Sequence, residues 1–205
     1  MSKQVVKVRI EPSALAQLQK AQVNLCLARG LIFDGENFSG NVVYSMVAHG
    51  NLSTGVELEW DDEFEVFETD VFEFNETVKY RTQIHKVQAG QTVVFDVDRS
   101  SVNGDPNPDK PISVQNYWVS GARIGIRTLN KAPFFISNPR VNGSWDALSR
   151  SPKFSVFWKA AVVPGTIFDA DLIETFDFLV EPDEPEVRLS YQTEEPRWRR
   201  HNLLQ

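Results

Sequence analysis

The chain has 205 residues, of which 41% are hydrophobic and 24% are charged, and its formal net charge is −7. Fourteen Phe and five Trp supply enough bulky apolar surface for a packed core, so the composition excludes an intrinsically disordered chain. The negative net charge repels phosphate backbones, so we expect no nucleic-acid partner.

Cysteine usage and hydropathy bear on the compartment. Cys26 is the single cysteine, which excludes an intrachain disulfide, and its apolar neighbours predict a buried thiol. The N-terminal residues lack the apolar core of a signal peptide. No apolar run approaches the roughly 18 residues that a membrane span needs. We therefore expect no transmembrane segment, and a protein that stays in the cytoplasm or is released without a conventional signal peptide.

The first half of the chain reads as short strands with one helix. Alternating apolar and polar residues are typical of a strand with one buried face. Pro12 is tolerated in the first turn of a helix, so the following Ala- and Leu-rich residues predict a short helix over 14–21. The strands expected in this half cover residues 3–10, 23–28, 42–48, 77–84 and 91–97.

Residues 56–79 form the most acidic stretch of the chain. Apolar residues alternate with carboxylates as far as Val66, which predicts a half-buried strand with an acidic outer face. The alternation slips at Phe67, so we expect a bulge or turn near residues 68–70 and an acidic hairpin. Carboxylates this dense repel one another, and a cation, basic side chains on a neighbouring strand or a partner would relieve the repulsion. The acidic row consists of Glu57, Glu59, Asp61, Glu63 and Glu65.

The second half contains two irregular segments. Residues 99–111 hold three prolines and a glycine, which interrupt a sheet ladder. Residues 132–143 read as a loop that contains Phe134 and Phe135. The strands expected here cover residues 114–119, 122–129, 154–158, 173–179 and 187–191, followed by a basic C-terminal tail.

Many short strands separated by turn residues favour an all-β fold. We predict a single-domain antiparallel β-sandwich, jelly-roll or immunoglobulin-like in topology, with a short N-terminal helix and long loops. No repeat with a fixed period occurs, which argues against a propeller or solenoid. We expect the sandwich to cover residues 1–195 and the basic tail to cover 196–205.

No residue pattern predicts an enzyme or a cofactor. The three histidines fall in a turn, a strand and the tail, and no nucleophile elbow, Walker A sequence or dinucleotide fingerprint occurs. We therefore expect a non-enzymatic protein without a cofactor. A hydrolase using two carboxylates is the lowest-ranked alternative, because the acidic stretch offers many candidates.

A calcium site is a weak candidate in residues 96–109. This segment offers oxygen ligands from Asp96, Asp98 and Asp105, and calcium takes six to eight such ligands. The spacing fails the EF-hand pattern, and Asp beside Gly or Pro is typical of ordinary turns. We therefore predict no metal.

The first functional hypothesis is a binding protein that recognises a protein partner, or a second copy of itself, through surface charge. The acidic hairpin would meet the basic tail of a neighbour, with Trp198 as an anchor. Such association weakens as salt rises. The basic residues of the tail are Arg197, Arg199 and Arg200.

The second hypothesis is a lectin-like or toxin-like module that binds glycan or lipid through aromatic residues in loops. Asn142, Trp145 and Asp146 combine a flat aromatic ring with the polar groups that sugar sites use. Phe134 and Phe135 offer a further apolar contact. We favour the opposing expectation for Trp145, namely that it fills one end of the sandwich, because large aromatic side chains are usually buried.

Overall fold

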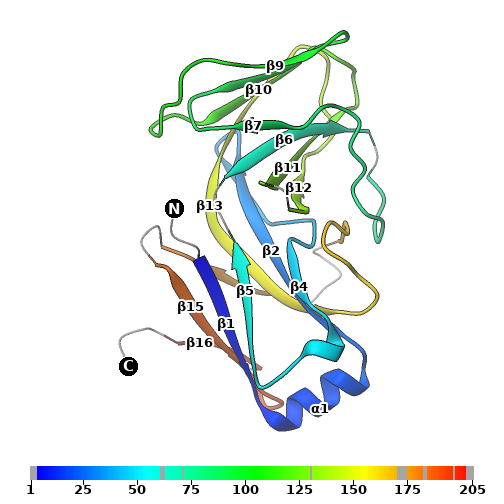
Figure 1. Cartoon of the computed structure of the whole chain (residues 1–205), viewed down its shortest axis with the longest axis vertical. Coiled ribbons are helices and arrows are strands. Elements are labelled where there is room, and N and C mark those ends of the chain that lie inside the picture. Colours follow the sequence, from blue (N-terminus) through cyan, green and yellow to red (C-terminus); the bar gives the residue numbers. More distant parts are fainter. Residues whose placement is uncertain are drawn as a thin grey trace.

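The computed structural model describes residues 4–60, 63–70, 72–129, 131–169, 175–181, 184–195 and 197–201. It is 52% strand and 6% helix, which confirms the predicted all-β, sandwich-like fold. Figure 1 shows an elongated molecule in which β2 (Asn24–Phe33) and the long β13 (Ser144–Lys159) run along the long axis. These two strands pair with each other in the largest sheet. A four-stranded sheet packs on this sheet at each end of the molecule (Figure 1).

The largest sheet has eight strands and spans both halves of the molecule. Its order is β3-β2-β13-β10-β8-β9, with β14 beside β13 and β4 beside β2. The first half of β13 pairs with β10 and its second half with β14, so one strand connects the two ends. The remaining strands of this sheet are β3 (Glu36–Phe38), β4 (Ser45–Val47), β8 (Thr92–Phe95), β9 (Ser100–Asn103), β10 (Ile112–Asn116) and β14 (Thr175–Leu179).

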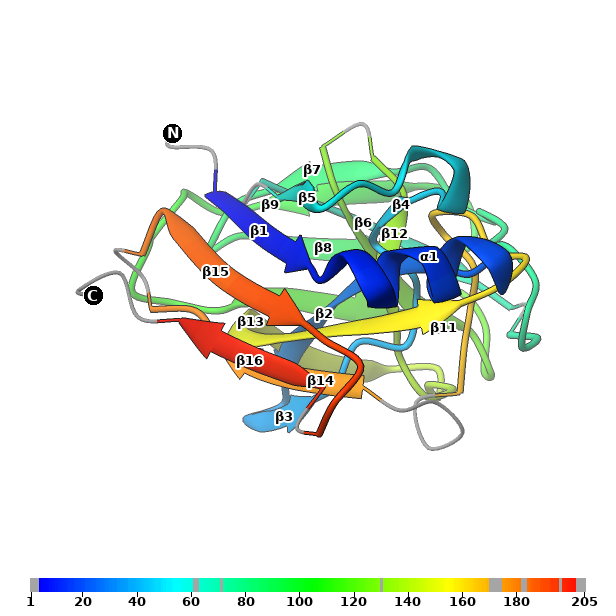
Figure 2. The ribbon, with the colours of Figure 1, turned by 90° about the horizontal axis from the view of Figure 1, so that it is seen from below.

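The lower four-stranded sheet has the order β16-β15-β1-β5. Apolar residues alternate along β1, and those facing inward, such as Val6 and Val8, are buried. Helix α1 (Pro12–Lys20) follows β1 across the lower end, as Figure 2 shows, and buries Ala14 and Leu18. The strands of this sheet are β1 (Gln4–Ile10), β5 (Gly55–Trp60), β15 (Glu186–Tyr191) and β16 (Trp198–His201).

The upper four-stranded sheet has the order β12-β11-β6-β7. Its strands are β6 (Phe64–Thr69), β7 (His85–Val87), β11 (Arg123–Thr128) and β12 (Pro133–Ile136). All six residues of β6 are buried. Phe64 and Val66 face the core between the sheets, whereas the ring of Phe67 contacts Tyr80, with centroids 4.6 Å apart. A short 3-10 helix (His49–Asn51) precedes β5.

The acidic hairpin that we predicted is not present. β5 pairs with β1 in the lower sheet, and β6 pairs with β11 and β7 in the upper sheet. The register of β6 against β11 runs without a shift from Phe64 to Thr69, so the slip in alternation is not a bulge within this strand. The slip arises because both faces of β6 are covered. Alternation is a local signal and does not specify which strand is the partner.

The sheets are mixed rather than purely antiparallel. β1 and β15 are parallel, as are β8 and β10. Between β8 and β10 the chain returns through β9 on the other side of β8, so β10 can start again in the direction of β8. Single-sequence patterns contain no information on strand direction, which explains why the prediction missed these two pairs.

Both predicted irregular segments contain a strand. Residues 100–103 form β9, and residues 133–136 form β12, in which all four residues are buried. Residues 77–84, predicted as a strand, form only an isolated bridge at Thr77. Residues 198–201 of the predicted tail form β16, where Trp198 is only 8% exposed.

Candidate binding face

Trp145 is a large apolar side chain on the surface of the upper half. It lies near the start of β13 and is 62% exposed, whereas the next residue, Asp146, is fully buried. Successive side chains of a strand point to opposite faces, so Trp145 projects from the outer face of the largest sheet. The alternative expectation, that Trp145 fills one end of the sandwich, is therefore wrong.

The strand register places two rows of side chains around Trp145. Residues directly opposite one another in neighbouring strands share one face of the sheet. The first row runs across β13, β10, β8 and β9 and comprises Trp145, Gln115, Val94 and Ser101. The second row comprises Ala147, Ser113, Thr92 and Asn103. We call these eight residues the Trp145 face.

The Trp145 face carries hydrogen-bonding groups without charge. Gln115, Ser113 and Thr92 are half-buried, and their side chains make no hydrogen bond within the described part of the chain. Ser101 and Asn103 are exposed, and the Asn103 amide donates to the Ser101 hydroxyl at 3.3 Å. Hydroxyl and amide side chains both donate and accept hydrogen bonds. The face therefore presents both donors and acceptors, the groups that hydroxyl groups pair with.

A tight turn positions Trp145. The peptide N–H of Gly143 donates to the carbonyl of Asn116 at 2.6 Å, and Gly143 has φ +84°, which a side chain would strain. The buried Asn116 side chain donates to the carbonyl of Val119 at 2.9 Å and accepts from the N–H of Trp118 at 2.9 Å. These bonds lock the backbone beside Trp145, so the indole is presented by a rigid element.

Exposed apolar residues adjoin the same turn. Tyr117, Val119 and Val141 are all well exposed, and the side-chain amide of Asn142 donates to the carbonyl of Tyr117 at 3.4 Å. Of the predicted site residues, Asn142 and Trp145 therefore do lie together at the surface of the upper end.

The other three residues of that predicted site are interior. Asp146 is buried and forms an ion pair with Arg140, whose guanidinium also lies 3.3 Å from Asp34. Phe134 and Phe135 are buried in β12 rather than exposed in a loop. The four apolar residues of β12 are covered on both faces, so they lack the alternation of a half-buried strand. Pro133 and Pro139 also made this segment resemble a loop.

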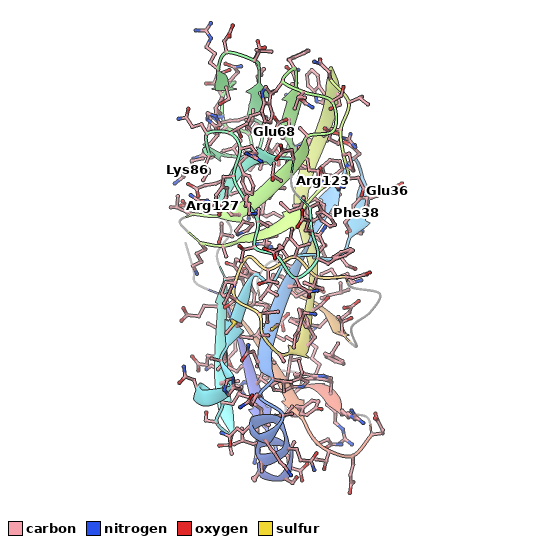
Figure 3. The ribbon with its side chains drawn as sticks, turned by 90° about the vertical axis from the view of Figure 1, so that its right-hand side faces the viewer. Glu36, Phe38, Glu68, Lys86, Arg123 and Arg127 are labelled. Atoms are coloured by element: carbon pink, nitrogen blue, oxygen red, sulfur yellow. The ribbon has the colours of Figure 1, made fainter. Side chains whose placement is uncertain are left out.

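Three carboxylates of the acidic row are paired with basic side chains on neighbouring strands. Lys7 lies 3.8 Å from Glu57, Lys86 lies 2.5 Å from Glu63, and Arg127 lies 2.6 Å from Glu65. Figure 3 shows Lys86 and Arg127 on the same side of the upper half. Glu59 also interacts with another residue, and Asp61 lies outside the described residues. Of the three ways to relieve the repulsion, the fold uses neighbouring strands.

Two basic residues of the predicted tail, Arg197 and Arg200, also have partners in their own part of the chain. Arg200 lies 2.7 Å from Glu184 and donates to the carbonyl of Leu179, and Arg197 lies 3.0 Å from Glu195. Arg199 is exposed. Trp198 stacks on Trp158, with ring centroids 5.7 Å apart. β16 and β5 are opposite edges of the lower sheet, so the tail does not contact the acidic row of its own chain.

The weak calcium candidate gains no geometric support. Among the described residues, no group of three or more His, Cys, Asp or Glu side chains is arranged to hold a metal ion. Asp96 instead accepts a hydrogen bond from the N–H of Val97 at 2.7 Å, as turn residues commonly do. Cys26 is buried as expected, and burial raises the pKa of its thiol to about 12.

Glu68 is a buried acid that the sequence patterns did not identify. Its side chain is 0% exposed, and neither carboxyl oxygen has a hydrogen-bond partner in the described part of the chain. Glu68 lies opposite Ile124 of β11, within the upper half (Figure 3). Burial raises the pKa of this carboxyl to about 8. The sequence does contain a signal for this burial, because Glu68 follows Val66 by two residues and so lies on the inward face of β6.

Glu68 is a candidate for one half of a pair of catalytic carboxylates. It lines neither the cavity beside β7 nor the open hollow over the lower sheet. A hydrolase would need two carboxylates facing one cleft. The hydrolase alternative therefore stays a prediction without support from this group.

No family model, curated protein or solved structure matches this chain. Within the described residues, no helix is both long enough and apolar enough to cross a membrane. The functional assignment accordingly depends on the chemistry of the surfaces described above.

Proposed function

We propose that this protein is a non-enzymatic, glycan-binding β-sandwich and that the Trp145 face is its binding site. The observation that supports this proposal is the exposed indole of Trp145, 62% accessible beside a row of uncharged hydrogen-bonding side chains. A flat exposed ring beside hydrogen-bonding side chains offers both kinds of contact that a sugar can make.

A sugar ring has the chemistry that this face complements. Its C–H groups pack on a flat aromatic side chain, and its hydroxyl groups both donate and accept hydrogen bonds. Gln115, Ser113 and Thr92 supply partners of the same kind next to Trp145. Because none of the eight residues is charged, the face favours a neutral glycan over an anionic one.

The shape of the face favours an oligosaccharide over a single sugar. The rows cross four neighbouring strands, which spans roughly 15 Å at about 4.8 Å between strands. A sheet surface is also shallow, so a ligand gains affinity by contacting several residues along it. We therefore expect weak binding of monosaccharides and stronger binding of extended neutral chains.

The test is a screen of the full chain on a panel of neutral and sulfated oligosaccharides, followed by calorimetric titration of the best ligand. Trp145→Ala should weaken binding about tenfold or more, since loss of one aromatic stack corresponds to roughly 1.4 kcal/mol. Gln115→Ala should weaken it less. Phe74→Ala is the matched control, because Phe74 is an exposed aromatic residue elsewhere on the chain.

Two results would contradict the proposal. One is unchanged affinity in Trp145→Ala for a ligand that the parent chain binds. The other is binding to lipid vesicles that Trp145→Ala abolishes, with no glycan bound at all. Thermal melting of each variant verifies that folding is intact.

Charge-driven self-association, the first hypothesis from the sequence, stays a prediction. Arg197 and Arg200 already have acidic partners in their own part of the chain, and Glu65 of β6 is paired with Arg127. Exposed ion pairs of this kind are screened by salt and individually weak. The glycan proposal does not depend on the oligomeric state.

A further inference from the structure

A cavity of about 450 Å³ opens at the waist of the molecule, where β13 passes from the upper to the lower half. Its walls are the edge strand β7, the loop after β9 and residues 148–150 of β13. Buried core side chains form its floor, namely Phe64, Val87, Ile112 and Leu148. This volume is in the range of sites that bind small organic molecules, roughly 300–1,000 Å³.

The rim of this cavity is positively charged, although the chain as a whole carries −7. Among the described residues that line it, three are cationic, namely Lys86, Lys110 and Arg150, and one, Glu63, is a carboxylate. Glu63 is already engaged by Lys86 at 2.5 Å. Lys110 is exposed and has no ion-pair partner within the described residues, so its ammonium group is available to a ligand.

Arg150 places a cation of the rim close to the apolar floor. Its guanidinium lies 5.9 Å from the centroid of the Phe64 ring, within reach of a cation–π contact. A ligand that packs on Phe64 therefore lies next to the Arg150 guanidinium. Cation and apolar wall meet at the same point of the cavity.

The loop that forms one wall is fixed before any ligand arrives. The N–H of Asn107 donates to the carbonyl of Ala89 at 2.7 Å, and the N–H of Gly90 donates to the carbonyl of Pro111 at 3.1 Å. Gly90 has φ +85°, and a Cβ at this position would lie 2.6 Å from the Asn107 nitrogen. Three prolines further limit the loop, so a ligand loses little affinity to ordering it.

We propose that this cavity binds an amphipathic organic anion, with an apolar body on the floor of core side chains and one carboxylate held by Lys110, next to the Arg150 guanidinium. The apolar floor selects the body of the ligand. Lys110 selects its head group, because charge-assisted hydrogen bonds are the strong ones, and the positive charge of Arg150 nearby adds to the attraction. The site is separate from the Trp145 face and does not depend on the glycan proposal.

The probe is decanoate, titrated below its critical micelle concentration into the full chain, with decan-1-ol as the uncharged match. We expect saturable binding of decanoate that weakens as salt rises. Decan-1-ol should bind with an affinity at least about tenfold lower than that of decanoate. Lys110→Glu should weaken decanoate binding about tenfold or more, whereas Lys110→Arg should retain it. Lys20→Glu is the matched control, because it makes the same change in net charge on α1.

Three outcomes would overturn this proposal. They are equal affinity for decanoate and decan-1-ol, no effect of Lys110→Glu, and full competition by inorganic phosphate, which has no apolar body. Trp145→Ala should leave decanoate affinity unchanged. Failure of the glycan screen with this result intact would therefore contradict the proposed function alone.

Discussion

Trp198 and Trp158 stack face to face, with ring centroids 5.7 Å apart and ring planes inclined by 18°. Trp198 lies on β16, near the C-terminus, and Trp158 lies near the end of β13 in the opposing sheet. Phe176 of β14 also stacks on Trp198, with ring centroids 5.9 Å apart. The last described strand therefore completes the core of the lower half instead of extending from it as a free tail.

Removal of this stack should destabilise the protein. Trp198→Ala should lower the free energy of unfolding by about 3 kcal/mol, because a buried Trp leaves a large cavity. Urea denaturation followed by circular dichroism measures the change. Arg199→Ala, on the same strand but exposed, should change stability by less than about 0.5 kcal/mol. Equal stability of the two variants would show that β16 is dispensable.

Glu68 should make stability fall as the pH rises. The folded-state pKa of this carboxyl, about 8, lies above its ordinary value of 4.5, so the folded chain binds the proton more tightly than the unfolded chain. Stability from this group is complete below about pH 4.5 and is lost progressively up to about pH 8. Glu68→Gln cannot ionise and should be more stable than the parent at pH 8 by roughly 2–4 kcal/mol.

The measurement for Glu68 is the difference in unfolding free energy between parent and Glu68→Gln at several pH values. Other groups titrate in the same range, and the difference cancels them. The two proteins should converge near pH 4. A difference that does not change with pH would mean that Glu68 is already neutralised by a group outside the described residues.

Gly125 should tolerate no larger side chain. It lies opposite Phe67 on the neighbouring strand, and a Cβ at Gly125 would lie 2.2 Å from the Phe67 ring. Phe67 is buried against Tyr80 and cannot move away freely. Gly125→Ala should therefore cost roughly 1–3 kcal/mol of stability. Gly50→Ala meets no atom within 4 Å and is the control, and thermal melting of both variants is the measurement.

Part of the binding face was accessible from the sequence. Asn142 and Trp145 were candidates because of their residue types, and the alternation from Trp145 to Leu148 is consistent with Trp145 on the outer face. Its neighbours Gln115 and Thr92 were not identified, since they come from strands 30 and 53 positions away, by difference of residue numbers. Residues of one face meet only through strand pairing.

The errors in the sequence predictions have one common cause. Phe134 and Phe135 were assigned to a loop, and Glu57 and Glu65 to one hairpin, because each was judged by its immediate neighbours. Pro133 begins β12, a position that a strand tolerates, so the proline was not a reason to reject a strand. Burial on both faces removes the period of two from which strands are recognised.

The sequence by itself determined that the chain is all-β, where most of its strands and its helix lie, and that Cys26 is interior. These features follow from side-chain periodicity and turn residues, which act over a few positions. Tertiary structure decided that β5 and β6 belong to different sheets, that basic neighbours pair the carboxylates, and that Trp145 is exposed while Phe134 is buried. Strand partners lie far apart along the chain, so their choice depends on how all the apolar faces are covered at once.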